Sequence, residues 1–589
     1  MSPVGLCLLL VLQLARTASH PVSPNGRDLG GLTAGGSYLG SKVCNSCHAA
    51  IYKSFSKTDM GRSMSRVTPS LLSQLRPPAT IFDTRLNRHF SVFVKQGELY
   101  QSEWETAANG KEVFRDTEPV GWIIGTGANA WGGIIQRGER LFEAPLTFYS
   151  KTRTWALSPG YEQVDRGFSR PVDGPCVYCH SARPNPEADS AGEFRTPPFD
   201  ELAIGCETCH GPGADHVREM SGGKAKARSE IVNPAKLAPW LADNICMLCH
   251  QNGDARVLQP GRSFRDFRPG QPLDRTLAIL MVPSTRESPP DSDHIQHYFS
   301  MTLSKCYRSS AGKLGCITCH DPHVEPAAQD APGYFRDKCF TCHSEANCTA
   351  SAGNRQQTTP PDNCIACHMP KRDVTQISHA SLTNHRVIST PEEPFPEITF
   401  QLTKSPPDLV HLSAIPDEAD DLLPPLTLLQ AYGQLAVAHR EYLSRYFEVA
   451  KQLEMSEPKN VNVLEALASR SLQQQTDKDE RDAMDYLKRA IELGSNSAWD
   501  YDQLGRRLMK ERRFPEAAVC FRKGIQKAPY DPKLYAQLAE DYVAQNKSQE
   551  AITTLKQALR TFPQLDWLRG LLNELEENNS SNRPAESLR

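Results

Sequence analysis

One short motif, Cys-x-x-Cys-His, occurs seven times between residues 44 and 368 and dominates the sequence. A histidine follows the second cysteine in every copy, so the motifs use fourteen of the 18 cysteines. Zinc ribbons also pair cysteines at this spacing but do not require that histidine, and redox disulfide motifs are not repeated in this way. Motifs one to seven, in chain order, are Cys44/Cys47/His48, Cys176/Cys179/His180, Cys206/Cys209/His210, Cys246/Cys249/His250, Cys316/Cys319/His320, Cys339/Cys342/His343 and Cys364/Cys367/His368.

The spacing fits covalent attachment of haem c. Two thiols separated by two residues can each form a thioether with one vinyl group of the porphyrin, and the next histidine then supplies the proximal nitrogen to iron. We therefore expect seven covalent haems c, bound by the cysteines of all seven motifs, with the seven motif histidines as proximal ligands.

The far side of each iron decides what a haem can do. A side chain bound there makes the haem an electron carrier, whereas an open position allows a small molecule to bind. Seven further histidines lie in the haem region, but their number assigns no pairs. His323 in "CHDPH" follows its own motif too closely to share that iron, and His216 is expected at the start of a helix after the Gly-Pro-Gly turn of "CHGPGADH". We expect both to bind a neighbouring iron.

The other histidines are weaker candidates for this distal position. His385 in "LTNHR" and His379 are both candidates, although one of them could instead hydrogen-bond to a ligand. In "DHIQHYF", His297 competes with His294, and we favour His297. His89 lies in a strand-like stretch, where an exposed polar residue is an equal explanation.

The segment after motif one carries methionines in place of histidines. "AAIYKSFSKTDMGRSM" is a plausible helix that includes Met60 and Met64. Thioether ligation by either would raise the potential of the first haem, and Met64 is slightly favoured. The alternative is that the methionines only pack against the porphyrin.

Residues 1–19 predict a signal peptide. Leu6 to Leu14 is mostly apolar and Thr17-Ala18-Ser19 offers small residues for cleavage, although no Lys or Arg precedes the apolar stretch. We expect export to the periplasm or cell surface and no transmembrane segment in the mature chain, because no later stretch reaches eighteen apolar residues. In such an oxidising compartment we also expect a disulfide between Cys306 and Cys348.

The length of 589 residues exceeds what one core can fill, and the near balance of 66 basic and 69 acidic residues gives no sign of a nucleic-acid surface. Two segments, "HFSVFVKQGELYQSEWE" and "LTFYSKTRTWAL", read as hairpins. "GTGANAWGG" lacks the ending of a phosphate loop and reads as a tight turn. We expect a signal peptide (1–19), a first haem segment (20–77), a β-rich insert (78–165), a six-haem region (166–390), a Pro/acid-rich linker (391–425), helical repeats (426–575) and a disordered tail (576–589).

The C-terminal part has a 34-residue period. Residues 498–531 and 532–565 align without gaps, with small residues at Gly505 and Ala539 and a proline at Pro529 and Pro563. These features are typical of tetratricopeptide repeats, in which small residues let two antiparallel helices approach closely. Residues 426–455 are expected to add a capping pair. Such arrays often hold protein partners, although a fold alone does not prove binding; we expect a redox protein to dock here.

Several phrases resemble a known family. "GCETCHGPGADHV", "LGCITCHDPH", "CIACHMPK" and "LTNHRV" look like multihaem cytochromes c of the cytochrome c-552/c-554 type with C-terminal tetratricopeptide repeats, over residues 40 to 565. The resemblance implies a loop- and helix-rich multihaem cytochrome c domain with a small β insert, followed by an all-α array of repeats. It also implies electron transfer at the periplasm or cell surface.

Two departures from that family bear on function. Asn129 stands where related sequences often have a distal histidine, which implies that one haem is five-coordinate or bound by methionine. No motif reads Cys-x-x-Cys-Lys, so the lysine-ligated haem of pentahaem nitrite reductases has no counterpart here. We expect an exported heptahaem electron carrier. The alternatives are an oxidoreductase acting on a small nitrogen or sulfur compound at one open haem, and a scaffold dominated by the repeats.

Overall fold

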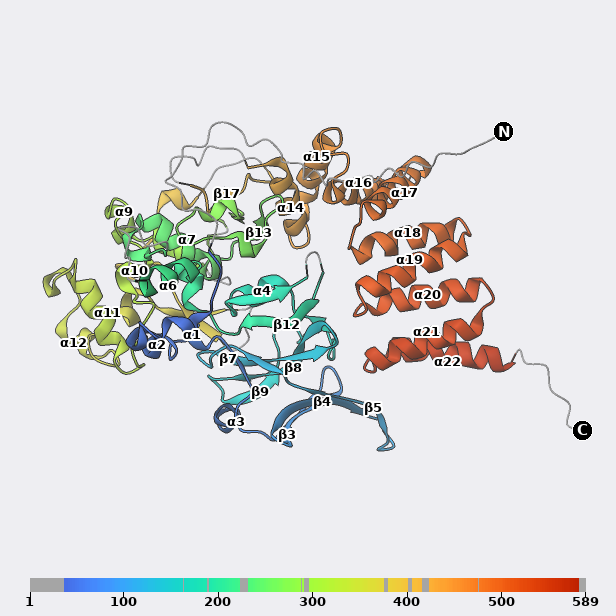
Figure 1. Cartoon of the computed structure of the whole chain (residues 1–589), viewed down its shortest axis with the longest axis horizontal. Coiled ribbons are helices and arrows are strands. Elements are labelled where there is room, and N and C mark those ends of the chain that lie inside the picture. The colour runs from blue at the N-terminus through green and yellow to red at the C-terminus, as the bar shows by residue number, and fades with distance from the viewer. Residues whose placement is uncertain are drawn as a thin grey trace, which may run out of the picture.

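In the computed structural model of the chain, the structure describes residues 36–162, 164–187, 190–222, 231–287, 289–290, 296–374, 380–400, 405–415, 423–474 and 476–581. The expected signal peptide and the candidate ligands His294 and His379 lie outside these residues. Figure 1 shows a centre built of strands, with a helical array on one side of it and short helices on the other.

Two antiparallel sheets form the largest core. The first contains β2(Ala79–Asp83), β3(Arg88–Lys95), β4(Glu98–Thr106) and β5(Glu112–Pro119) in sequence order. The second follows the order β1(Met64–Arg66), β6(Trp122–Ile124), β7(Ala130–Arg137), β8(Arg140–Tyr149) and β10(Arg170–Pro171), with β9(Thr154–Leu157) also paired to β8.

Both predicted hairpins are confirmed as β3–β4 and β8–β9. The turn between β3 and β4 places Gln96 and Gly97 at positive φ, which glycine adopts without strain. Apolar side chains from both sheets meet in one cluster that includes Phe90, Leu99 and Phe148. The Gln101 side chain links the sheets, because its amide donates to the Leu146 carbonyl and its oxygen accepts from the Leu146 N–H.

Three smaller sheets lie among the motifs themselves. They are β11(Arg183–Pro186) with β12(Phe194–Glu201), β13(Ala255–Leu258) with β14(Leu277–Met281) and β17(Val410–His411), and β15(Lys371–Val374) with β16(Ala380–Thr383). The expected loop- and helix-rich domain with one small β insert is therefore wrong, because further sheets form between motifs two and three, after motif four and after motif seven. β17 also ties part of the expected linker to β14.

Short helices contain or flank the motifs, apart from the helix Pro69–Leu75, whose Leu71 and Leu75 pack in the core of the two large sheets. They are α1(Ser41–Cys44), α2(Ala49–Phe55), α3(Pro69–Leu75), α4(Gly174–Tyr178), α5(Cys206–His210), α6(Ala214–Ser221), α7(Pro239–His250), α8(His297–Thr302), α9(Lys305–Ser309), α10(Cys316–Cys319), α11(Ala331–Phe340), α12(Ala352–Gln356) and α13(Cys364–His368). A motif occupies one helical turn, so in motif one the His48 N–H donates to the Cys44 carbonyl four residues earlier, at 2.8 Å.

The C-terminal helices form the expected repeat array. They are α14(Pro425–Leu435), α15(Leu443–Leu453), α16(Val461–Gln474), α17(Asp477–Glu492), α18(Ala498–Lys510), α19(Phe514–Lys527), α20(Pro532–Ala544), α21(Ser548–Thr561) and α22(Asp566–Ser581). Gly505 lets α18 and α19 approach, since a Cβ there would lie 2.7 Å from the Phe521 ring. Residues 576–581, expected to be disordered, belong to α22.

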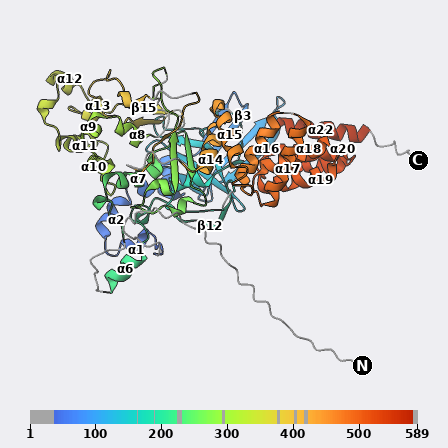
Figure 2. The same ribbon diagram turned by 90° about the horizontal axis from the view of Figure 1, so that it is seen from above.

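Equivalent turns of two successive repeats attach the array to the sheets. Tyr530, after α19, packs edge-on against Phe142 of β8 with ring centroids 6.4 Å apart. One repeat later, the Gln564 carbonyl accepts from the Arg88 guanidinium of β3 at 2.8 Å. Figures 1 and 2 both show the array at the opposite end of the molecule from α11 and α12.

Candidate functional site

Several of the Cys-x-x-Cys-His motifs lie against one another, although they are far apart in the sequence. Thiols of different motifs are close neighbours in three pairs: Cys44 with Cys206, Cys179 with Cys249, and Cys246 with Cys316. Motif four therefore touches both motif two and motif five. Burial raises the pKa of Cys209 to about 12, whereas a hydrogen bond from Cys249 lowers the pKa of Cys179 to about 7.

The second cysteines of motifs one and seven, Cys47 and Cys367, are placed differently. Both are exposed, and neither belongs to the three thiol pairs. The Cys47 sulfur instead accepts from the hydroxyl of its neighbour Ser46, at 3.8 Å. Haem attachment by Cys47 and Cys367 therefore stays a prediction that depends on the motif spacing alone. Further exposed motif cysteines are Cys176, Cys339 and Cys342.

Buried polar side chains hold the motifs in this arrangement. The Glu207 carboxylate, inside motif three, accepts from the Gly40 and Gly213 N–H groups, each at 2.7 Å. It thus ties the approach to motif one to the turn before His216. Asp243 of α7 accepts from the Cys316 N–H at 2.8 Å and joins motif four to motif five in the same way.

Four motif histidines each face a histidine from another part of the chain. The ring centroids are 6.4 Å apart for His48 and His216, 5.9 Å for His210 and His323, 5.5 Å for His250 and His297, and 6.1 Å for His320 and His385. All four second histidines are among the distal ligands expected from the sequence. In three of the pairs the second histidine follows the motif that comes two motifs later in the chain. His216 follows motif three and faces motif one, His323 follows motif five and faces motif three, and His385 follows motif seven and faces motif five.

These separations can be compared with those around a haem iron. Imidazole nitrogens bind metals at about 2.0–2.1 Å, so two imidazoles on opposite sides of one iron have ring centroids roughly 6 Å apart. The four pairs leave that gap. Among the described residues, no three His, Cys, Asp or Glu side chains come together as a metal site, but haem iron takes at most two ligands from the protein.

Hydrogen bonds orient three of the histidine rings. Nδ1 of His210 lies 2.8 Å from the Val232 carbonyl, and Nδ1 of His368 lies 2.6 Å from the Ile388 carbonyl. Nδ1 of His385 likewise lies 3.0 Å from a carbonyl, that of Thr383. A carbonyl can only accept, so Nδ1 carries the proton and Nε2 keeps its lone pair. Metal-binding histidines commonly have this arrangement.

Burial also keeps several of these rings neutral. It lowers the pKa of His297 to about 2 and that of His385 to about 4, with neighbouring histidines adding to the effect. Burial lowers the pKa of His180, His250 and His320 as well. A neutral imidazole is the form that binds a metal.

The methionines after motif one are not arranged as expected. The predicted helix ends at Phe55, and Met64 lies in β1, paired with Ile124 and only 2% exposed. Its side chain packs in an apolar cluster with Trp122 and Val177. The residue that faces His48 is His216, and Met64 is surrounded by core residues, so ligation by Met64 stays a prediction from the sequence.

Other candidates from the sequence lie apart from these pairs. His89 stacks on Trp104 within the first sheet, with ring centroids 5.1 Å apart. His180, His343 and His368 belong to none of the histidine ring pairs seen among the described residues.

The predicted disulfide between Cys306 and Cys348 is wrong, because both are free thiols. They lie beside different motifs: Cys306 is near Cys342 of motif six, whereas Cys348 is near Cys364 of motif seven.

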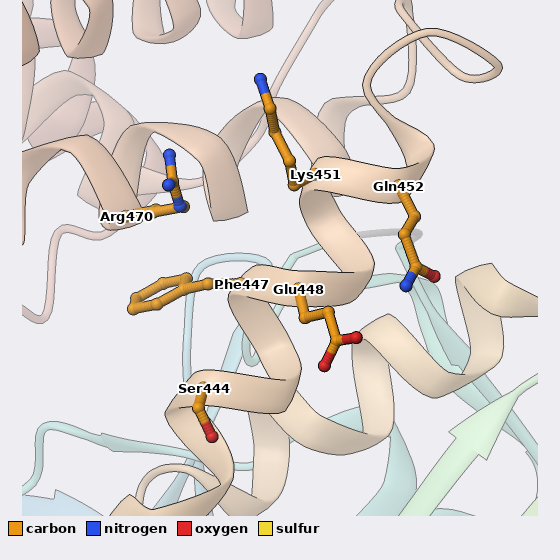
Figure 3. A pocket seen from close by; sticks show the side chains of 6 residues that line it. All are labelled: Ser444, Phe447, Glu448, Lys451, Gln452 and Arg470. Carbon is orange, nitrogen blue, oxygen red and sulfur yellow. The ribbon is translucent and has the colours of Figure 1, made fainter.

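The repeat array has a hollow of its own, of about 420 Å³ between α15 and α16. Figure 3 shows Phe447 and Glu448 on one helix and Arg470 on the other, with Lys451 above them. Sequence reasoning gave no sign of this hollow, since none of its residues forms a recognisable motif. In the described part of the chain, no helix is both long and apolar enough to cross a bilayer.

No protein-family model matches the chain, and no curated protein does. Solved structures are similar over about a quarter of it. A TPR protein of Thermus thermophilus has 17% identity and a TM-score of 0.22, covering 27% of this chain and 84% of that one. MamA from Desulfovibrio magneticus RS-1 has 15% identity and a TM-score of 0.23, covering 27% and 88%. The TPR2B domain of yeast Sti1, in a complex with pHsp70, has 20% identity and a TM-score of 0.19, covering 21% and 98%.

The repeat assignment itself depends on the chain's own helix pairs and their 34-residue period. These make the C-terminal part a tetratricopeptide-type array, an architecture suited to docking proteins.

Proposed function

We propose that the chain is an exported electron-transfer protein that carries seven covalently bound haems c. The observation that carries the proposal is the set of four imidazole pairs, each with one ring on a Cys-x-x-Cys-His motif and a gap suited to one iron. Zinc would need about four protein ligands gathered around one point, for example the two motif cysteines with two histidines, whereas no three His, Cys, Asp or Glu side chains of the described residues come together in that way. The motif phrases further support a relationship to multihaem c-type electron carriers.

The chain's own residues would set the properties of these haems. The motif cysteines would hold the porphyrins, and the paired histidines would fill both axial positions, which suits electron transfer better than ligand binding. The bound group supplies one-electron chemistry at iron. Hydrogen bonds such as that from His210 Nδ1 to the Val232 carbonyl make the imidazole a stronger donor to the metal.

The repeat array would hold a redox partner. Its turns at Tyr530 and Gln564 are already occupied by the sheets, so a partner would use another face. The hollow between α15 and α16 offers Phe447 for apolar contact and the Arg470 cation for an acidic group.

A second candidate function is small-molecule chemistry at motif two. His180 is in none of the histidine ring pairs among the described residues. Ser63 links this motif to the "GTGAN" turn, because its hydroxyl donates to the His180 carbonyl and its own carbonyl accepts from the Gly125 N–H. An iron without a second protein ligand can bind and reduce a small nitrogen or sulfur compound.

The test is production of the full chain in a bacterial host that attaches haem c outside the cytoplasm. Seven haems per chain are expected by intact mass and by the pyridine haemochrome spectrum. Electron paramagnetic resonance of the oxidised protein should show mainly low-spin iron. A chain that matures without haem would refute the proposal, and a large high-spin signal that responds to added nitrite or hydroxylamine would favour the second candidate.

A further inference from the structure

Four imidazoles form one continuous row at the centre of the motif region. His250 and His297 are 5.5 Å apart by ring centroids, His297 and His385 are 4.1 Å apart, and His385 and His320 are 6.1 Å apart. The outer two gaps fit an iron, as above. The middle gap is a direct ring contact, with the planes inclined by 25°. The row thus consists of two iron positions whose inner histidines touch.

His297 is held in the row by the residue that follows motif four. Gln251, fully buried, forms a β-bridge with Gln296, and its side-chain oxygen accepts from the Phe299 N–H at 2.9 Å. The two contacts are made at Gln296 and at Phe299, on either side of His297 in the sequence. The ring therefore keeps a fixed place relative to His250.

His385 is held from the segment that follows helix α8. Ser304, fully buried just after α8, accepts from the Val387 N–H at 2.9 Å. The carbonyl of Thr383 accepts from His385 Nδ1 and sets the ring's rotation. Contacts with α8 fix the position of His297, and Ser304, two residues beyond the end of α8, fixes that of His385. The fold therefore determines the contact between the two inner rings.

Arg372 of β15 lies beside both inner rings. It lines, together with His297, His385 and Thr383, a gap of only about 10 Å³, too small for more than one water. Lys371, one residue earlier in the strand, is exposed.

Given the haems of the proposed function, we infer that His297 and His385 are the distal ligands of the irons on motifs four and five. Their ring contact joins these two irons into one coupled pair, and the Arg372 charge raises the reduction potential of both. A nearby cation stabilises the reduced, less positive iron, and its effect is large in a buried site. Arg372 is a positioning residue for potential and touches no substrate.

The ligand assignment is tested by His297→Ala and His385→Ala in the full-length haem protein. Each is expected to convert one of the seven irons from low-spin to high-spin in the electron paramagnetic resonance spectrum, and the double variant two. His89→Ala is the matched control, because His89 packs on Trp104. If an alanine variant fails to mature, His297→Met keeps a ligand and should raise one midpoint potential.

The role of Arg372 is tested by Arg372→Gln beside Lys371→Gln, with spectropotentiometric titration. Arg372→Gln should lower two midpoint potentials and Lys371→Gln none. Equal shifts in both variants, or unchanged spin states in His297→Ala and His385→Ala, would overturn the inference while haem is still bound. A chain without haem would instead refute the proposed function.

Discussion

Arg88 is a buried arginine of the first sheet that also reaches the repeats, where its guanidinium donates to the Gln564 carbonyl. Arg88, 5% exposed, makes an ion pair with Glu105 at 2.8 Å and with Asp165 at 3.3 Å, and its charge also faces the fully buried Glu103. Removing one partner of a buried ion pair typically costs about 3–5 kcal/mol, because the remaining charges stay buried.

We therefore expect Arg88→Met to lower the free energy of unfolding by about 3–5 kcal/mol, as measured by urea titration followed by far-ultraviolet circular dichroism. Arg85→Gln is the control. Arg85 pairs with Asp83 at the surface, where ion pairs contribute under about 1 kcal/mol. Equal losses in the two variants would contradict a structural role for Arg88.

Another buried carboxyl makes stability depend on pH. Burial raises the pKa of Glu143 to about 7, although Arg170 lies 2.8 Å away and opposes the shift. The folded chain then binds a proton that the unfolded chain releases near its usual value of 4.5. Stability from this group is therefore full below about pH 4.5 and lost as pH rises to about 7.

The measurement is the difference in unfolding free energy between the natural chain and Glu143→Gln across this pH range. Two and a half pKa units correspond to roughly 3 kcal/mol. The natural chain should lose up to that amount relative to Glu143→Gln between pH 4.5 and 7. A difference that stays constant with pH would show that the pKa of Glu143 is the same in the folded and the unfolded chain.

At the scale of elements, two glycines in repeat helices have opposite roles. A Cβ at Gly505 of α18 would lie 2.7 Å from the Phe521 ring, whereas one at Gly570 of α22 would meet nothing within 4 Å. Gly505→Ala should lower the unfolding free energy by about 1–2 kcal/mol through overpacking. Gly570→Ala should raise it by up to about 1 kcal/mol through helix propensity.

Thermal unfolding of both variants, followed at the helical minimum, checks this pair. The same substitution is made in each helix, so the sign of the change reports packing alone. If Gly505→Ala is stabilising, α18 and α19 are not as close as the structure has them.

Local patterns in the sequence predicted the elements that local patterns control. Alternation identified the β3–β4 and β8–β9 hairpins, and the 34-residue period identified the paired helices of the array. The segment around Met64 was predicted as a helix because its pairing partner, Ile124, is sixty residues away. The strand Arg183–Pro186 contains two prolines, and the strand Leu277–Met281 is buried at every position and so does not alternate. The fold class of the N-terminal part could therefore not be predicted from local patterns.

In the candidate site too, the local features could be predicted from the sequence and the long-range pairings could not. A covalent motif is a local property, so the seven attachment positions could be proposed from sequence. The histidine pairs join residues such as His48 and His216 from distant segments. Those pairings depend on Glu207, Gln251 and Ser304, whose hydrogen bonds exist only in the folded chain.

At the scale of the whole molecule, the array is fixed to the sheets by its own turns. Tyr530 packs on Phe142, and Arg140 lies over the Tyr530 ring while donating to the Gln526 carbonyl. Tyr530→Ala with Arg140→Ala should free this edge of the array. We expect the radius of gyration from small-angle X-ray scattering to increase, with the helix content unchanged.

Tyr486→Ala is the matched control, because Tyr486 hydrogen-bonds to Glu454 within the array. It should leave the radius of gyration unchanged. An unchanged radius in the double variant would mean that the remaining contacts, such as those of Arg88 with Gln564 and of Ser169 with the Thr561 carbonyl, are enough to hold the array in place. Adding Arg88→Met to the double variant removes the contact with Gln564 as well. If the turns at Tyr530 and Gln564 are the only attachment at that edge, the radius of gyration should then increase.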